Sequence, residues 1–231
     1  MFSEFLDVFL PTITTISTVI IFSSQLTILK KLKDNSNKDV IDPREAVPII
    51  PYIATLANCG LWFKYGLITH NTILLIVNGY GILTGSLIVF MLYTSMTRRK
   101  KATRIIILLM LTFAVCYIFI NENSGEDIKT LFKLSCCLAT IGFFSAPLLE
   151  LPRIIEYQDA SILSKPTAIS ALFSSFLWTS YGILISDKFI IAPNLVGFLS
   201  SFIQFCLILY YPSTSLDYSS LSTVGSQSPL A

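Results

Sequence analysis

Charged side chains are scarce in this chain of 231 residues. Asp, Glu, Lys and Arg make up 13% of it, about half the share of roughly 25% that soluble domains carry, whereas 53% of the residues are hydrophobic. A water-soluble fold of this length could not bury so much apolar surface, so the composition favours a protein whose solvent is lipid. The formal net charge of +2 gives no strong field that would attract nucleic acid.

Reactive groups are equally few. The single histidine is His70, and the sequence contains no HExxH, no Gly-rich phosphate loop and no GxSxG motif. All five cysteines lie in apolar stretches without a C-x-x-C pair, which argues against a disulfide framework. We therefore expect no enzyme, no metal site and no cofactor.

Ionisable residues are missing from the middle of the apolar stretches. The only acid in them is Glu150, near the end of one stretch, and no Lys or Arg is found at mid-stretch. Proton- or sodium-coupled carriers place carboxylates at membrane depth, so the pattern favours passive transport. The start, Met1 to Asp7, is acidic and no small-residue cleavage site follows, so the first apolar stretch predicts a retained helix.

Seven apolar stretches are present, each close to the roughly 20 residues that a helix needs to cross a bilayer. They cover residues 8–29, 47–68, 72–95, 104–121, 130–150, 166–186 and 189–211. No intervening loop is long enough for a soluble domain. Residues 213–231 are rich in Ser and Thr with one charge, which is typical of a disordered tail.

Basic residues gather in the odd-numbered loops. These are Lys30, Lys31, Lys33, Lys38 and Arg44 in the first, Arg98, Arg99, Lys100, Lys101 and Arg104 in the third, and Arg153 and Lys165 in the fifth. The even-numbered loops carry at most one Lys or Arg each. Because cytoplasmic loops carry an excess of Lys and Arg, we expect the N-terminus outside and the tail in the cytoplasm. We expect the plasma membrane rather than the Golgi or another endomembrane.

An internal repeat is the most informative feature. The pattern W-x-x-Y-G, eleven residues, N-x-x-G runs from Trp62 to Gly81 and again from Trp178 to Gly197, an offset of 116 residues. The repeat relates the first three stretches to the last three, and the unpaired fourth stretch inverts the direction so that both halves run in parallel.

The sequence therefore predicts an all-α integral membrane protein of seven transmembrane helices, arranged as two parallel three-helix bundles joined by an inverting linker helix. Residues 1–96 form the first repeat, 97–128 the linker helix and an outer loop, and 129–212 the second repeat. The axis between the halves is the expected path of a solute.

Two amides lie at membrane depth in equivalent places. Asn78 and Asn194 have apolar neighbours, and a buried amide is costly unless it is hydrogen-bonded. One such Asn alone would favour helix–helix bonding, but two related by the repeat favour contact with a solute that both donates and accepts, as sugar hydroxyls do. Trp62 and Trp178 offer flat apolar faces to a sugar ring, or belong to an interfacial aromatic belt.

Other residues suggest gates. Pro51, Pro147 and Pro166 would bend their helices and serve as hinges, although a proline in the first turn of a helix is ordinary. Tyr65 and Asp187 would both lie near the outer face, where a hydrogen bond between them would close the path. Two independent interfacial residues are the alternative.

These motifs together resemble the SWEET family of sugar transporters, over about residues 8–211. They are Pro51, Asn58, Cys59, Trp62, Tyr65, Gly66, Asn78, Gly79, Gly81, Ala146, Pro147, Leu148, Pro166, Trp178, Tyr181, Gly182, Asp187, Pro193 and Asn194. The resemblance implies a 3+1+3 fold, bidirectional facilitated uniport of mono- or disaccharides by alternating access, and homo-oligomers such as trimers.

The resemblance also implies roles for residues. Positions matching Asn78, Asn194 and Trp178 line the sugar pocket in that family, and we add Trp62 and Asn58 to the candidate substrate-binding set. Positions matching the three prolines are inner hinges, and those matching Tyr65 and Asp187 form an outer gate.

Two departures concern the gates and the pocket. Plant members have a proline where Ser24 aligns, so the set of four prolines is incomplete here and Ser24 takes the fourth hinge position. This region is more similar to animal members. Plant members often have a small residue at Trp62, so a second Trp narrows the pocket and favours a monosaccharide.

Two other functions remain open at this point. A seven-helix receptor shares the helix count, the outside N-terminus and the basic inner loops, but it lacks an internal repeat. A related repeat transporter could carry a non-sugar solute, such as an amino acid, although a carboxylate would want Lys or Arg inside the bundle.

Overall fold

The computed structural model describes residues 2–36, 49–96, 99–121 and 123–211, and these residues are helical apart from short turns. The elements are α1 (Phe2–Gln25), α2 (Thr27–Ser36), α3 (Ile50–Thr69), α4 (Thr72–Ser95), α5 (Lys100–Phe119), α6 (Glu126–Ser145), the 3-10 helix η2 (Ala146–Glu150), α7 (Leu151–Tyr157), α8 (Lys165–Leu184) and α9 (Lys188–Tyr210). Residues 37–48 of the first loop and the expected tail lie outside the described residues.

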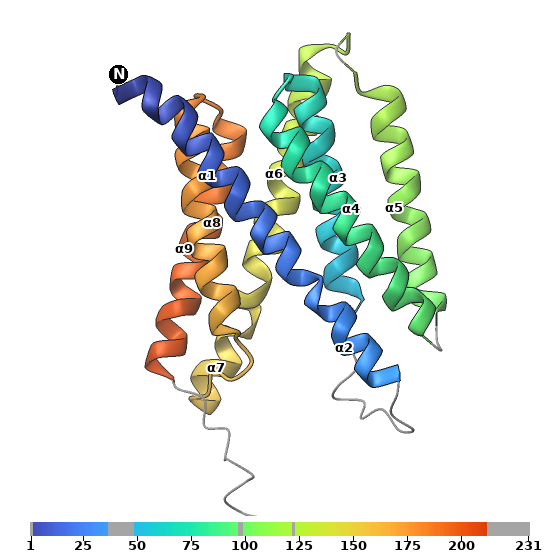
Figure 1. Cartoon of the computed structure of the whole chain (residues 1–231), viewed down its shortest axis with the longest axis vertical. Helices are drawn as coiled ribbons and strands as arrows, with labels where there is room; N and C mark the ends of the chain where they lie inside the picture. The colour runs from blue at the N-terminus through green and yellow to red at the C-terminus, as the bar shows by residue number, and fades with distance from the viewer. Residues whose placement is uncertain (1, 37–48, 97–98, 122, 212–231) are drawn as a thin grey trace, which may run out of the picture.

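Two three-helix units face each other, with α5 between them in the chain (Figure 1). One unit consists of α1 with α2, α3 and α4, and the other of α6 with η2 and α7, α8 and α9. In each unit the second and third helices form an antiparallel hairpin, α3 with α4 and α8 with α9. Helix α1 crosses the front diagonally and packs on both α4 and α8, so it joins the units. The predicted fold is confirmed.

Six helical segments of the described chain are long and apolar enough to span a membrane. The remaining long helix, α3, is not among them, and it carries Asn58, Lys64 and Tyr65. Large apolar side chains are exposed on the outer faces, most densely on α5, where Leu108 and Ile118 are examples. Lipid would cover these faces, in keeping with a membrane protein of several spans.

The first predicted stretch, 8–29, is interrupted. Helix α1 ends at Gln25, and the amide of Leu26 bonds to the carbonyl of Ser23, three residues back, at 3.0 Å. The hydroxyl of Ser24 donates to the carbonyl of Ile21 at 2.7 Å, and that of Thr27 to the carbonyl of Ser24 at 2.7 Å. Hydroxyls that take carbonyls from the helix ladder bend helices, so this break forms without a proline.

The second unit breaks at the matching depth. Helix α6 gives way to η2 at Ala146, where Pro147 supplies no backbone donor. Phe22 packs on Gly81 in the first unit, and Phe144 packs on Gly197 in the second. These equivalent contacts align the first helices of the two units at an offset of 122 residues in the sequence. By that offset the counterpart of Pro147 is Gln25, one residue beyond Ser24.

Close approach between helices explains the repeated glycines. A Cβ on Gly81 would lie 2.6 Å from the sulfur of Cys59 and 2.8 Å from the Phe22 ring. A Cβ on Gly197 would lie 2.7 Å from the Phe144 ring. These separations are too short for any side chain, so the last glycine of each repeat permits the tight contact between helices.

The expectation that no Lys or Arg lies inside the helix bundle is wrong. Lys64 lies within α3 and is buried, with 7% of its surface exposed. Its Nζ sits 4.7 Å from the ring centroid of Tyr117 on α5, a cation–π contact that accounts for a charge inside an apolar helix. The side chain therefore ties the linker helix to the first unit.

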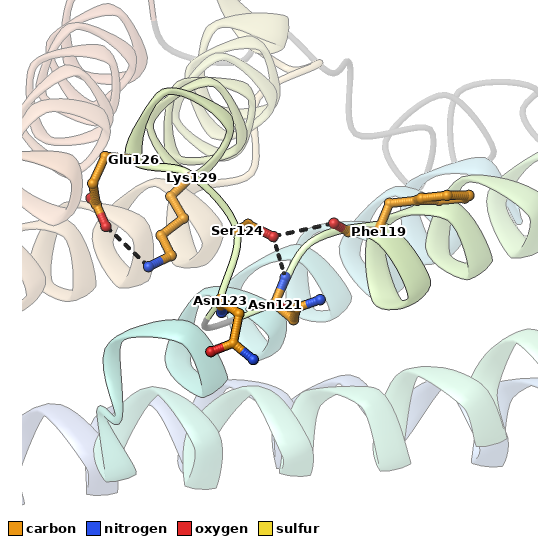
Figure 2. A network of polar contacts seen from close by, with 6 residues as sticks. All are labelled: Phe119, Asn121, Asn123, Ser124, Glu126 and Lys129. Atoms are coloured by element: carbon orange, nitrogen blue, oxygen red, sulfur yellow. Dashed lines mark hydrogen bonds and ion pairs between the residues drawn. The ribbon is translucent and has the colours of Figure 1, made fainter.

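The connection from α5 to α6 is ordered by its own polar groups (Figure 2). The hydroxyl of Ser124 accepts the Asn121 amide at 2.9 Å and donates to the Phe119 carbonyl at 3.2 Å. Lys129 pairs with Glu126 in the first turn of α6 at 3.0 Å. These contacts reverse the chain within a few residues, as the inverting linker requires.

Replacing Gly81 by Ala is expected to destabilise the folded protein by about 1–3 kcal/mol, because the added methyl overpacks the contact with Cys59 and Phe22. Gly142→Ala is the control, since nothing lies within 4 Å of a Cβ there. The melting temperature in detergent should fall for the first variant and stay level or rise for the second. Equal melting temperatures would contradict the packing argument.

Candidate functional site

A cavity of about 270 Å³ lies between the two units. It contains all five residues predicted to bind substrate: Asn58, Trp62, Asn78, Trp178 and Asn194. The rest of its lining includes Thr18, Phe22 and Gln25 of α1, Thr55 of α3, Thr140, Phe143 and Phe144 of α6, and Thr167, Ser170 and Ser174 of α8. Both halves of the repeat thus contribute to one chamber.

The two predicted amides are held in the same way. The Nδ2 of Asn78 donates to the carbonyl of Leu74 at 2.9 Å, and that of Asn194 to the carbonyl of Ile190 at 2.8 Å. A carbonyl only accepts, so the nitrogen must face it and the side-chain oxygen points elsewhere. Within the described residues neither oxygen has a partner, which leaves two acceptors and the second N–H of each amide for a ligand.

The indole N–H groups are also held. Trp62 donates to the hydroxyl of Thr140 at 2.8 Å, and Thr140 donates to Oδ1 of Asn58 at 2.8 Å. Trp178 donates to the hydroxyl of Thr18 at 3.1 Å. With their polar edges satisfied, both indole rings contribute apolar surface to the cavity lining. Asn58 keeps both N–H donors, because only its oxygen is used.

The cavity lining is polar without being charged. Hydroxyl, amide and indole groups alternate with apolar surface, and no Asp, Glu, Lys, Arg or His lines it. The described residues also contain no cluster of three His, Cys, Asp or Glu side chains that could hold a metal ion. Such a lining can exchange hydrogen bonds with a neutral hydroxylated molecule and stack on its apolar faces, and it offers no counter-charge.

Two matching hydrogen bonds join the units beyond one end of the cavity, where Tyr65 and Tyr181 pack against Trp62 and Leu74 of its lining. The hydroxyl of Tyr65 donates to Oδ2 of Asp187 at 2.6 Å, as the sequence suggested. The hydroxyl of Tyr181 donates to Oδ1 of Asn71 at 3.1 Å. Each acceptor is also the N-cap of the third helix in its own unit, Asn71 of α4 and Asp187 of α9. We call these two bonds the reciprocal latch, because each tyrosine bonds to the cap of the opposite unit.

The expected hinge residues lie toward the other end. Pro51 and Pro166 are exposed in the first turns of α3 and α8, the ordinary place for a proline. Pro147 lies at the break between α6 and η2, and Ser24 just before the break after α1. The four positions therefore flank the ends of the helices that line the cavity, away from the reciprocal latch.

Sequence reasoning missed several of these residues. Asn71 and Tyr181 are at the same offset of 116 residues from Asp187 and Tyr65, so the repeat itself could have revealed the second half of the latch. Thr18 and Thr140 match at the offset of 122 residues that also relates Phe22 to Phe144, but so short a match gives too weak a signal in the sequence alone.

Comparisons with known proteins agree with this architecture. The model of the family described as "Sugar efflux transporter for intercellular exchange" matches residues 8–101 and again residues 130–216. A protein named Sugar transporter SWEET1 from Drosophila pseudoobscura pseudoobscura is 31% identical over 211 residues, covering 89% of this chain and 90% of its own. The human protein of that name is 27% identical over 211 residues, covering 90% and 92%.

A solved structure has the same fold. The structure of a eukaryotic SWEET transporter superimposes with a TM-score of 0.73 at 21% sequence identity, covering 91% of this chain and 99% of the other. The two matched segments fall on the two three-helix units, and the similarity extends over nearly the whole length of the relatives. The chain belongs to the SWEET family, the sugar efflux transporters for intercellular exchange.

Proposed function

We propose that this protein carries sugars across a membrane as a passive, bidirectional uniporter that works by alternating access, with monosaccharides favoured. The supporting observation is the uncharged polar cavity between the units, where two anchored amides and two indole rings meet. Relatives named as sugar transporters support the class of substrate. A carboxylate substrate is disfavoured because the lining holds no cation.

Alternating access explains the arrangement of the latch and hinges. The reciprocal latch joins the units beyond one end of the cavity in the conformation described, and the breaks at Leu26 and Pro147 lie toward the other end. Rocking of the units about these breaks would open the latch and narrow the opposite end. We propose that the latch faces outside, with the N-terminus, and that the basic loops face the cytoplasm, in the plasma membrane. Assembly into homo-oligomers, such as trimers, belongs to the same proposal.

The size of the cavity supports a small sugar. A volume of about 270 Å³ lies just below the range of about 300–1,000 Å³ that is usual for small-molecule sites. Trp62 is one of the large side chains that limit it.

Replacing Asn78 or Asn194 by Ala is expected to lower glucose flux at least about tenfold, since each change removes an oriented amide that can bond to the sugar. The measurement is uptake of radiolabelled glucose into proteoliposomes. Asn123→Ala, which removes the same group from the exposed outer loop, should transport at the normal rate. Normal glucose flux in both cavity variants would contradict the assignment of this cavity as the sugar site.

The reciprocal latch offers an internal comparison. Tyr65→Phe removes a bond to a carboxylate, and Tyr181→Phe removes a bond to a neutral amide. Bonds to charged groups contribute about 1.5–3 kcal/mol and neutral ones about 0.5–1.5 kcal/mol. We expect Tyr65→Phe to shift the protein further toward the outward-open state.

A cysteine in place of Leu74, which lines the cavity, can report that shift in a background whose native cysteines are replaced. An impermeant thiol reagent added outside should label it fastest in the Tyr65→Phe protein, more slowly in Tyr181→Phe and slowest with both tyrosines present. Identical rates in all three proteins would contradict a gating role.

Trp62→Ser tests the selection for small sugars. Removing the indole enlarges the cavity, so the ratio of sucrose flux to glucose flux should rise. Trp178→Ser is the matched change in the other unit. If Trp62→Ser leaves sucrose flux at the background of empty liposomes, the size argument is wrong.

A further inference from the structure

A second hollow lies where α4 ends and α5 begins, at the lower right of Figure 1 and apart from the cavity between the units. It is open, encloses about 800 Å³, and is lined by Thr94, Ser95, Arg99, Lys100, Thr103 and Arg104 among others. Three of these residues are basic and three carry hydroxyls, and none of the described lining residues is an acid.

The guanidinium of Arg99 is fixed in place. Its Nε donates to the carbonyl of Met96 at 2.9 Å and its Nη2 to the carbonyl of Thr94 at 2.7 Å, while the group lies 5.3 Å from the ring centroid of Tyr93. The Tyr93 hydroxyl contacts that of Thr103, 3.0 Å away, so α4 and α5 are joined here. Only two of the five guanidinium N–H groups are used, and the others are available to an anion.

Within the described residues no acid pairs with the basic side chains of the hollow. Lys100 and Arg104 are exposed, and neither has an ion-pair partner in the part of the chain that the structure describes. Both lie in the first turns of α5, whose free backbone N–H groups add to the positive potential. The surroundings therefore favour a ligand with several negative charges.

Apolar side chains continue from the hollow along both helices. On α4 the face that carries Thr94 also exposes Leu87, Phe90 and Met91, and on α5 the face that carries Thr103 and Arg104 exposes Ile107, Leu108 and Leu111. Residues three, four and seven apart share a helix face, so on each helix these apolar side chains, which we call the apolar stripe, lie on the same face as residues that line the hollow. A free anion would contact only the basic residues, whereas a lipid would contact both the basic residues and the apolar side chains.

We propose that this hollow binds the headgroup of an anionic phospholipid with more than one phosphate, a phosphoinositide, whose acyl chains lie along the apolar stripe. Basic clusters next to a transmembrane helix attract such lipids, and each Lys or Arg contributes about 1 kcal/mol. The bound headgroup would hold the start of the linker helix against the end of α4.

The test is binding to the full-length protein in detergent, measured by titration with dioctanoyl phosphatidylinositol 4,5-bisphosphate. Lys100→Gln/Arg104→Gln should weaken the affinity about 25-fold, since about 1 kcal/mol for each cation is about a fivefold change. Arg99 is left unchanged in this variant, because its side chain also bonds to carbonyls at the end of α4. Arg153→Gln/Lys165→Gln, with the same loss of charge at exposed sites of another basic loop, should change the affinity less than about twofold.

Two ligand controls separate a lipid from a free anion. Dioctanoyl phosphatidylcholine should show no saturable binding, and inositol 1,4,5-trisphosphate, which lacks acyl chains, should bind at least about tenfold more weakly than the lipid. Equal weakening in the two double variants would reduce the effect to overall charge and overturn the site. Equal affinity for the lipid and the free headgroup would overturn the role of the apolar stripe and leave a soluble anion as the ligand.

Discussion

Each amide at membrane depth is anchored to a carbonyl of its own helix, and this anchoring determines what the central cavity can recognise. An Asn in an apolar helix that bonded to a neighbouring helix would be structural and would have nothing left for a solute. Here the bonds from Asn78 to Leu74 and from Asn194 to Ile190 satisfy one N–H each and orient the oxygens. Trp62 and Trp178 are held differently, since each indole N–H bonds to a threonine of the opposite unit, Thr140 and Thr18 respectively. The cavity is thus preorganised without any charge.

The duplicated unit explains why these features come in pairs and also why they differ. Equivalent positions face each other across the interface between the units, so one latch bond is matched by another and one amide by another. The pairs are not identical: Asn58 in one unit corresponds to Ser174 in the other, and Asp187 corresponds to Asn71. A sugar is itself asymmetric, and an asymmetric lining can bind it in a defined orientation.

Much of this could be predicted from the sequence, because the repeat supplies long-range information that a single helix lacks. The offset of 116 residues located the amides and indoles and, applied to Tyr65 and Asp187, would have found Tyr181 and Asn71. The break after Gln25 was indicated only by the resemblance, which placed a hinge position at Ser24, because Ser and Thr hydroxyls replace the proline that would have signalled it. Lys64 was missed because one charge in an apolar run gives no sign of its aromatic partner, which is 53 residues away in Tyr117. In the sequence, the basic residues between α4 and α5 indicated only the orientation of the chain in the membrane. The structure shows that Arg99, Lys100 and Arg104 also line a common hollow.

The central claim is that an uncharged cavity carries a neutral sugar without help from an ion. The most direct measurement is equilibration of radiolabelled glucose in proteoliposomes that have the same pH and the same salt on both sides and no membrane potential. The account predicts that glucose enters until its inside and outside concentrations are equal, and that collapsing an imposed proton or sodium gradient changes nothing. Flux that appears only with such a gradient, or no glucose flux at all, would contradict it.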